Sequence, residues 1–178
     1  MKKTLVLILA LCLVFLTACS PATPTDALKA DLENAKSSPE EIMGEIGDSG
    51  FGEEATTALI DKILEFEYEL GEEVVTDNKA AVETTITTYP FGQIFTNVVT
   101  NFLSQASANA GNMSDEELAK LMDQLLVDEL EKAEKTYTST ITIELEKDGD
   151  NWVVQETTEM SNSLTGGLID FANQMNGL

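Results

Sequence analysis

The sequence contains neither histidine nor arginine, and it has only two cysteines among its 178 residues. Histidine is the side chain whose ordinary pKa lies near neutrality, so acid–base catalysis would have to rest on carboxylates, tyrosine or lysine. Without arginine there is no planar guanidinium to bind phosphate or carboxylate groups in a bidentate manner. A metal site would depend on oxygen ligands. We therefore predict a non-enzymatic protein that uses no cofactor and no metal.

Basic residues are scarce as well. Ten lysines stand against 32 acidic residues, which gives a formal net charge of −22 and a pI of about 4.1. Affinity for nucleic acid depends on cationic contacts with phosphates, so we expect no nucleic-acid partner. Anionic lipid headgroups should also repel the chain. We interpret the acidic surface as solubilising, with the binding of hard cations as the alternative.

Long apolar runs are absent except near the N-terminus, where residues 5–16 are almost entirely apolar. This run is too short to span a bilayer, and it follows Lys2 and Lys3, as in a signal peptide. It ends in Leu16-Thr17-Ala18-Cys19, which resembles the lipobox of bacterial lipoproteins. The resemblance implies cleavage after Ala18 and a diacylglyceryl group on the sulfur of Cys19. The alternative is an ordinary secretory signal in which Cys19 is incidental.

Removal of residues 1–18 has consequences for the rest of the chain. This segment holds two lysines and no acidic residue, so its loss lowers the net charge from −22 to −24. Cys12 is lost with it and Cys19 carries lipid, so the mature chain has no thiol for a disulfide or a nucleophile. Residues 19–25 form a Pro/Ser/Thr-rich tether, and residues 26–178 form a single domain. We expect a lipid-anchored protein on the outer, extracytoplasmic face of the cell membrane.

Apolar periodicity and capping signals predict an alternation of helices and hairpins. Helices are expected over residues 26–36, 53–64, 91–110 and 114–135, with a short helix restarting at 38–41 and a C-terminal amphipathic segment over 164–175. Strands are expected over 66–70, 80–89, 137–145 and 152–160, with turns at 76–79 and 147–151. The order predicts an α+β fold in which N-terminal helices pack on a curved antiparallel sheet of about four strands. The helical pair 91–135 is inserted between two hairpins, and a helix ends the chain.

The element order, together with the hairpin sequence from Lys147 to Val154, resembles the cystatin-like or nuclear-transport-factor-2-like lipoproteins of Firmicutes. The resemblance implies a cone formed by the curved sheet and helices around a central cavity, where some members bind ligands or catalyse reactions and others only dimerise. Five aromatic side chains could line this cavity, but in a chain with few aromatics we expect them first of all to be core residues. The candidates are Phe66, Tyr68, Phe102, Tyr137 and Trp152.

Three local motifs indicate chemistry that the remaining sequence does not support. Residues 47–50, Gly-Asp-Ser-Gly, match the nucleophile segment of chymotrypsin-like proteases, but the chain has no histidine to act as base. Residues 148–151 are similar to the start of a calcium loop, but the required glycine at the sixth position is missing, so a hairpin turn is favoured. Glu65, Glu67 and Glu69 are expected on one strand face, as edge protection or a weak cation site.

The leading hypothesis is a non-enzymatic binding or interaction module for a protein, peptide or apolar small molecule. The first alternative is a structural or antigenic surface lipoprotein without a ligand site. The second is an isomerase-like enzyme or a hydrolase that uses Tyr68 or Tyr137 with a carboxylate. The apolar stripes over residues 118–126 and 164–175 could pack within the monomer or form a homodimer.

Overall fold

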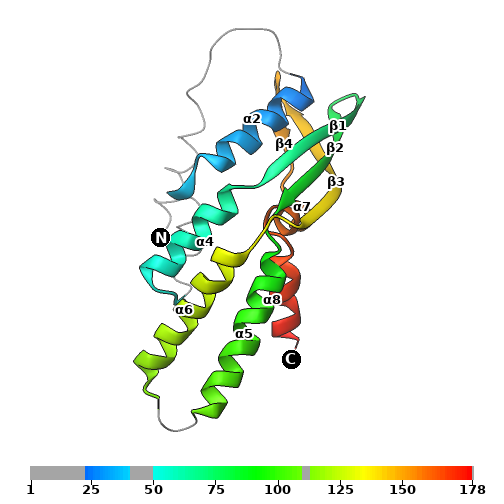
Figure 1. Cartoon of the computed structure of the whole chain (residues 1–178). Helices are drawn as coiled ribbons and strands as arrows, with labels where there is room; N and C mark the ends of the chain where they lie inside the picture. Colours follow the sequence, from blue (N-terminus) through cyan, green and yellow to red (C-terminus); the bar gives the residue numbers. More distant parts are fainter. Residues whose placement is uncertain (1–22, 41–49, 110–112, 178) are drawn as a thin grey trace, which may run out of the picture.

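An open four-stranded sheet forms one end of the molecule and a group of helices forms the other (Figure 1). The structure is a computed structural model that describes residues 23–40, 50–109 and 113–177. Within these residues there are six helices and four antiparallel strands, and the sheet does not close into a barrel. The predicted α+β fold is therefore confirmed.

The sheet is a simple meander in which each strand pairs with the next in the sequence. Its strands are β1 (Glu67–Thr76), β2 (Lys79–Thr88), β3 (Tyr137–Asp148) and β4 (Asn151–Val154), in the order β1-β2-β3-β4. Alternate side chains of β2 and β3 are buried on the inner face. The outer face carries threonine pairs, and the hydroxyl groups of Thr85 and Thr140 lie 3.0 Å apart.

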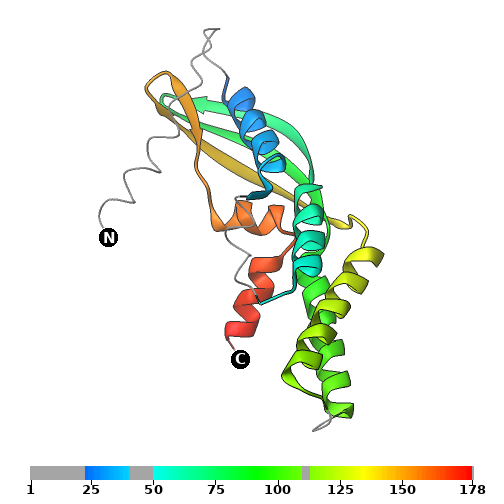
Figure 2. The same ribbon diagram turned by 90° about the vertical axis from the view of Figure 1, so that its left-hand side faces the viewer.

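Two helices pack against the inner face of the sheet, α2 (Pro24–Lys36) and α7 (Thr158–Leu164) (Figure 2). Leu28 and Leu32 of α2 are fully buried against the strands. The inner face is consequently filled by side chains. We call the buried residues of this half the sheet core: Leu28, Leu32, Phe66, Ala80, Val82, Ile86, Ile141, Ile143, Leu145 and Met160.

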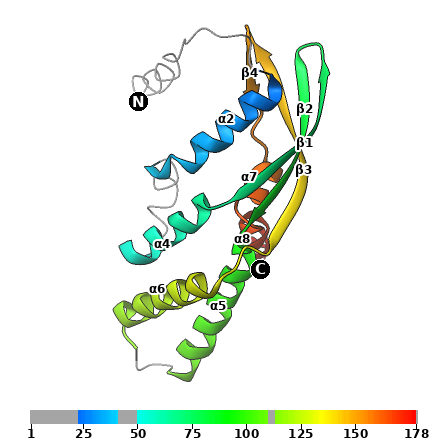
Figure 3. The same ribbon diagram turned by 45° about the horizontal axis from the view of Figure 1, so that its top comes forward.

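The second half of the molecule is built from α4 (Glu53–Leu64), α5 (Phe91–Ala108), α6 (Asp115–Lys132) and α8 (Leu168–Asn176). Helix α6 packs against α4 and α5, while α8 packs against the start of α5. Together α5 and α6 project away from the sheet, and we call this pair the arm (Figures 1 and 3). The buried residues of the helical core are Ala55, Leu59, Ile63, Tyr89, Phe91, Ile94, Val98, Leu126 and Leu130.

Local sequence signals account for where several helices begin. Ser114 caps α6 through a capping box, in which its side chain accepts from Glu117 N and Glu117 reaches back to Ser114 N at 2.8 Å, as predicted. Thr23 and Asp26 form an equivalent box at the start of α2. Pro90 follows β2, as predicted, and α5 begins at the next residue. The restart predicted over residues 38–41 extends beyond the described residues.

The prediction of a strand over residues 152–160 was wrong beyond Val154. Strand β4 ends there, and residues 158–164 form helix α7 instead. The hydroxyl of Thr157 accepts a hydrogen bond from Met160 N at 3.1 Å and so caps this helix. Met160 is buried in the sheet core from this helical position. Met160 is an even number of residues from Trp152 and Val154, which is the spacing of side chains on one face of a strand. However, Thr157, which caps helix α7, lies between Val154 and Met160 and ends the strand pattern.

A glycine turn between α7 and α8 brings the chain against the connection between β2 and α5. Gly166 O accepts a hydrogen bond from Gly92 N at 3.1 Å. A Cβ atom on Gly166 would lie 1.8 Å from Tyr89 O, and the φ of Gly166 is +52°. Only glycine fits this position, because both the conformation and the close backbone approach exclude a side chain.

We predict that Gly166→Ala destabilises the protein far more than Gly149→Ala. Both glycines have positive φ, +52° and +63°, but nothing lies within 4 Å of a Cβ on Gly149. Gly149→Ala should therefore cost only the conformational strain, about 1 kcal/mol, whereas Gly166→Ala should cost several-fold more or prevent folding. Urea denaturation of the two variants measures the difference. Equal losses would show that the contact at Tyr89 is unimportant.

Candidate functional site

A groove of about 420 Å³ lies between the two halves of the molecule. Helices α2 and α7 contribute from the sheet half, and α4 and α8 from the helical half. It is larger than two other described hollows, of about 130 and 270 Å³. Its wall is mainly apolar and includes Ile63, Leu64, Phe66, Met160, Leu164 and Leu168.

The polar residues that line the groove are hydroxyl-bearing or acidic. Ser161 and Thr165 lie on or next to α7, and Asp31 and Glu156 supply carboxylates. Among the described lining residues there is no lysine. The arrangement can hold an apolar group and hydrogen-bond a neutral or cationic polar group, but it opposes an anionic one, since carboxylates repel negative charge.

The structure separates the five aromatic residues that the sequence offers as candidates for lining a cavity. Phe66 lines the groove, whereas Tyr68 and Trp152 pack against the sheet core. Tyr137 is half-buried at the start of β3, and Phe102 is half-buried on the arm. None of the four lines the groove in its described part.

Sequence reasoning missed most of the groove. The alternating pattern predicts that Met160 belongs to a strand, so it does not predict that Met160 lines the groove together with residues of α2. Leu164 and Leu168 were recognised only as parts of an amphipathic stripe. Their position depends on the turn at Gly166, which bends α7 and α8 into the wall of the groove.

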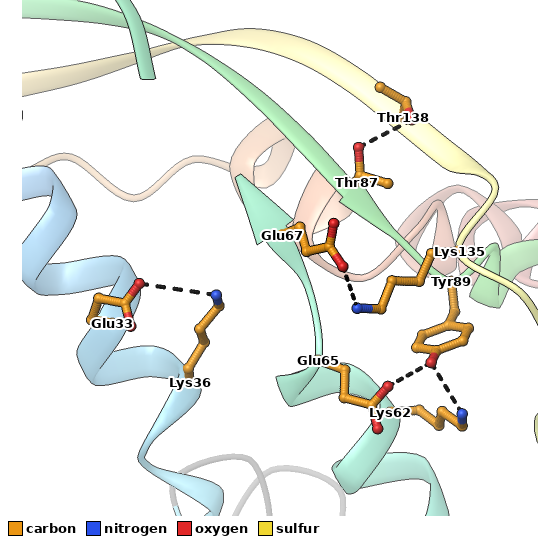
Figure 4. Close-up of polar contacts among 9 residues, drawn as sticks. All are labelled: Glu33, Lys36, Lys62, Glu65, Glu67, Thr87, Tyr89, Lys135 and Thr138. Carbon is orange, nitrogen blue, oxygen red and sulfur yellow. Dashed lines mark hydrogen bonds and ion pairs between the residues drawn. The ribbon is translucent and has the colours of Figure 1, made fainter. Parts of the chain in front are cut away.

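A second group of side chains lies where the chain crosses between the two halves (Figure 4). We call it the junction cluster: Lys62, Glu65, Glu67, Tyr89 and Lys135. The Tyr89 hydroxyl donates to the Glu65 carboxylate and accepts from Lys62 Nζ at 3.1 Å. Lys135 Nζ lies 2.7 Å from the Glu67 carboxylate.

The junction cluster links three separate chain crossings. Glu65 lies between α4 and β1, and Glu67 is the first residue of β1. Tyr89 lies between β2 and α5, and Lys135 lies between α6 and β3. The hydrogen bond with Lys135 lowers the pKa of Glu67, and the same bond raises the pKa of Lys135. Both groups are therefore charged over the whole neutral range. The junction cluster therefore holds together the three chain segments that connect the two halves.

The enzyme hypothesis requires Tyr68 or Tyr137 to face a buried carboxylate. Burial raises the pKa of Tyr68 to about 12, with its hydrogen bond to Glu33 contributing further, so the phenol stays protonated at neutral pH. In the part of the chain that the structure describes, no aspartate or glutamate is buried. Neither Tyr68 nor Tyr137 therefore faces a buried carboxylate there.

The predicted acidic strand face is shorter than expected. Glu65 is the C-cap residue of α4 and precedes β1, so it does not share the strand face of Glu67 and Glu69. Glu65 contacts Tyr89 and Glu67 pairs with Lys135. Among the described residues, no group of three histidine, cysteine, aspartate or glutamate side chains is arranged to hold a metal ion.

Comparison with known proteins does not assign the chain to a family. No family model matches it, and no curated protein matches its sequence. Among solved structures it is similar to that of YcdA from Bacillus subtilis strain 168, provisionally described as a lipoprotein, with a TM-score of 0.46 and 16% sequence identity. The similarity covers 82% of this chain and 47% of that one, so the present chain spans about half of its length. The cystatin-like and nuclear-transport-factor-2-like resemblance gains no support from these comparisons.

The residues that define the predicted membrane anchor, Ala18 and Cys19, lie outside the described residues. None of the helices described is long and apolar enough to cross a membrane.

We predict that Tyr89→Phe destabilises the protein by about 1–2 kcal/mol, because the substitution leaves Glu65 and Lys62 without their shared hydroxyl partner. Tyr68→Phe is the matched control. It removes an exposed hydrogen bond to Glu33 and should change stability by less than about 0.5 kcal/mol. Chemical denaturation of both variants tests this, and a loss at Tyr68 as large as at Tyr89 would contradict the special role of the junction cluster.

Proposed function

We propose that the protein is a non-enzymatic binding module that is anchored to the outer face of a bacterial cytoplasmic membrane by a diacylglyceryl group on Cys19. The observation that carries the binding role is the apolar groove between the two halves. Its volume of about 420 Å³ falls within the range of small-molecule sites, about 300–1,000 Å³.

The anchor follows from the sequence between Leu5 and Cys19. Two acyl chains hold a protein stably at a bilayer, because each buried methylene contributes about 0.8 kcal/mol and one chain alone is marginal. This binding is strong enough to keep a domain with a net charge of −24 at an anionic surface. The protein part therefore needs no lipid-binding face of its own.

The groove favours a ligand that is apolar and carries no negative charge. Apolar groups can pack on Leu64, Phe66 and Leu164, and a neutral polar end can reach Ser161 or Thr165. An anionic end would meet the carboxylates of Asp31 and Glu156. A small apolar alcohol or amine, or the apolar side chains of a peptide, meets these conditions.

The second candidate function is a surface spacer without a ligand. The observation that favours it is the filled inner face of the sheet, where Val82, Ile86 and Ile143 are at most 2% exposed. Among the described residues, side chains fill the face of the sheet on which the sequence resemblance implies a central cavity. A spacer and a binding module differ in whether the groove takes up a ligand.

We predict that Cys19→Ala abolishes incorporation of labelled fatty acid into the protein and leaves the precursor uncleaved, because the sulfur is the acylation site. Metabolic labelling in a bacterial host that processes lipoproteins, followed by gel mobility of the protein, measures both. Serine substitution of Cys12, which lies in the removed segment, is the control and should leave labelling unchanged. Normal labelling of Cys19→Ala would refute the anchor.

We predict that the groove binds an uncharged, environment-sensitive dye such as N-phenylnaphthylamine, and that Ala35→Phe lowers its affinity about tenfold by filling the groove. Ala119→Phe, on the exposed face of α6, is the matched control and should not change the affinity. Dodecanol should displace the dye more effectively than laurate, its anionic counterpart. No dye binding to the folded wild type, or equal binding by both variants, would favour the spacer.

A further inference from the structure

The first described residues of the chain are fixed to one end of the sheet. Thr25 N and Thr25 Oγ1 donate to the Glu73 carboxylate of β1 at 2.9 and 2.6 Å. Pro24, the first residue of α2, is buried. The point where the chain enters the fold is therefore held beside the β1–β2 hairpin.

This entry point and the tip of the arm lie at opposite ends of the molecule. In Figures 1 and 3 the start of α2 lies near the β1–β2 and β3–β4 turns, while the far ends of α5 and α6 lie at the other end. Helices α5 and α6 have 18 residues each, which corresponds to about 27 Å of helix. The arm alone thus extends far from the sheet.

The proposed lipid anchor is close to the entry point along the chain. Cys19 and Thr23 are four residues apart, and even a fully extended chain spans at most about 3.6 Å per residue, or roughly 15 Å. Since Thr23 caps α2 through its hydrogen bond with Asp26, the start of the helix cannot move away from the bilayer by more than this distance.

The domain could stand upright on the membrane or lie flat on it, and the charge of the arm disfavours the flat orientation. Helix α6 carries seven acidic side chains and two lysines, and α5 carries no charged side chain. The arm is therefore repelled by anionic headgroups within the Debye length, about 10 Å at an ionic strength of 0.1 M. The hairpin end is acidic too, but the short tether holds it at the surface.

We infer that the domain stands upright on the membrane, with the turns at residues 77–78 and 149–150 facing the lipid headgroups and the arm pointing away. This inference rests on the proposed anchor at Cys19. Asp31 and Ala35, in the second half of α2, line the groove, so the groove lies away from the bilayer and takes its ligand from the aqueous phase. The outer half of the arm, which includes the 58% exposed Leu103 of α5, is the part that other extracytoplasmic molecules meet first.

The mature chain offers a clean way to test this orientation. Once Cys19 is acylated no other thiol remains, so a single introduced cysteine can be labelled. Asn78→Cys places a donor fluorophore in the β1–β2 turn, and Ser107→Cys places it in the last turn of α5. Each purified lipoprotein is inserted into vesicles of phosphatidylglycerol and phosphatidylcholine that contain an acceptor-labelled lipid, and energy transfer to the membrane is measured.

We expect energy transfer from position 78 to be about twofold or more stronger than from position 107, because α5 alone adds about 27 Å between the sheet and the tip of the arm. Equal transfer, or stronger transfer from position 107, would overturn the upright orientation while leaving the anchor intact. Failure of the protein to float with vesicles, with Cys19 still reactive as a thiol, would instead refute the proposed anchor.

A variant with a flexible Gly/Ser linker after Ala22 tests the cause of the orientation. A linker of about 20 residues has an end-to-end distance of about 25 Å, so the hairpin end is no longer held at the bilayer. The difference in transfer between positions 78 and 107 should then shrink towards zero. An unchanged difference would show that the hairpin end itself binds the membrane, and would overturn the assignment of the orientation to the short tether.

Discussion

Tyr89 lies where the chain passes from the sheet into the helices, and its contacts hold the two halves of the molecule against each other. The Tyr89 hydroxyl joins Glu65 and Lys62 from the end of α4, and its carbonyl lies against Gly166 in the turn that leads to α8. The two halves also meet where α7 packs on α8 and where Lys135 pairs with Glu67. Tyr89 adds contacts to both α4 and the glycine turn, so we assign to it a central part in holding the two groups of elements as one body.

Both the proposed ligand groove and the proposed orientation on the membrane depend on the contacts at Tyr89, which we call the Tyr89 joint. The groove has walls from both halves, α2 and α7 on one side and α4 and α8 on the other, so its shape depends on how the halves are held together. The upright orientation also requires a rigid joint, because the anchor is attached to the sheet half while the arm belongs to the helical half. A loose joint would let the arm tilt and would open or close the groove.

The sequence predicted the parts of the fold that depend on local signals. The helix over residues 53–64 has the predicted bounds, and the capping box at Ser114 and the turn after Thr76 are confirmed. The errors occurred where distant contacts decide the conformation. Met160 fits a strand by its spacing, but the cap at Thr157 and burial against α2 favour a helix. The groove could not be predicted because its walls come from four elements whose arrangement depends on contacts among Gly92, Gly166 and Tyr89. Local periodicity contains no information about contacts between residues so far apart in the sequence.

If the contacts at Tyr89 hold the two halves as one body, the halves should unfold together. Trp152 is the single tryptophan and packs against the sheet core, so its fluorescence reports that half, whereas circular dichroism at the helical band is dominated by α4, α5, α6 and α8. Urea unfolding of the wild-type protein should give coincident transitions by the two probes, as expected for one cooperative unit. Two separated transitions, with helix signal lost at a different urea concentration from the tryptophan signal, would contradict the claim that the Tyr89 joint makes the halves one body.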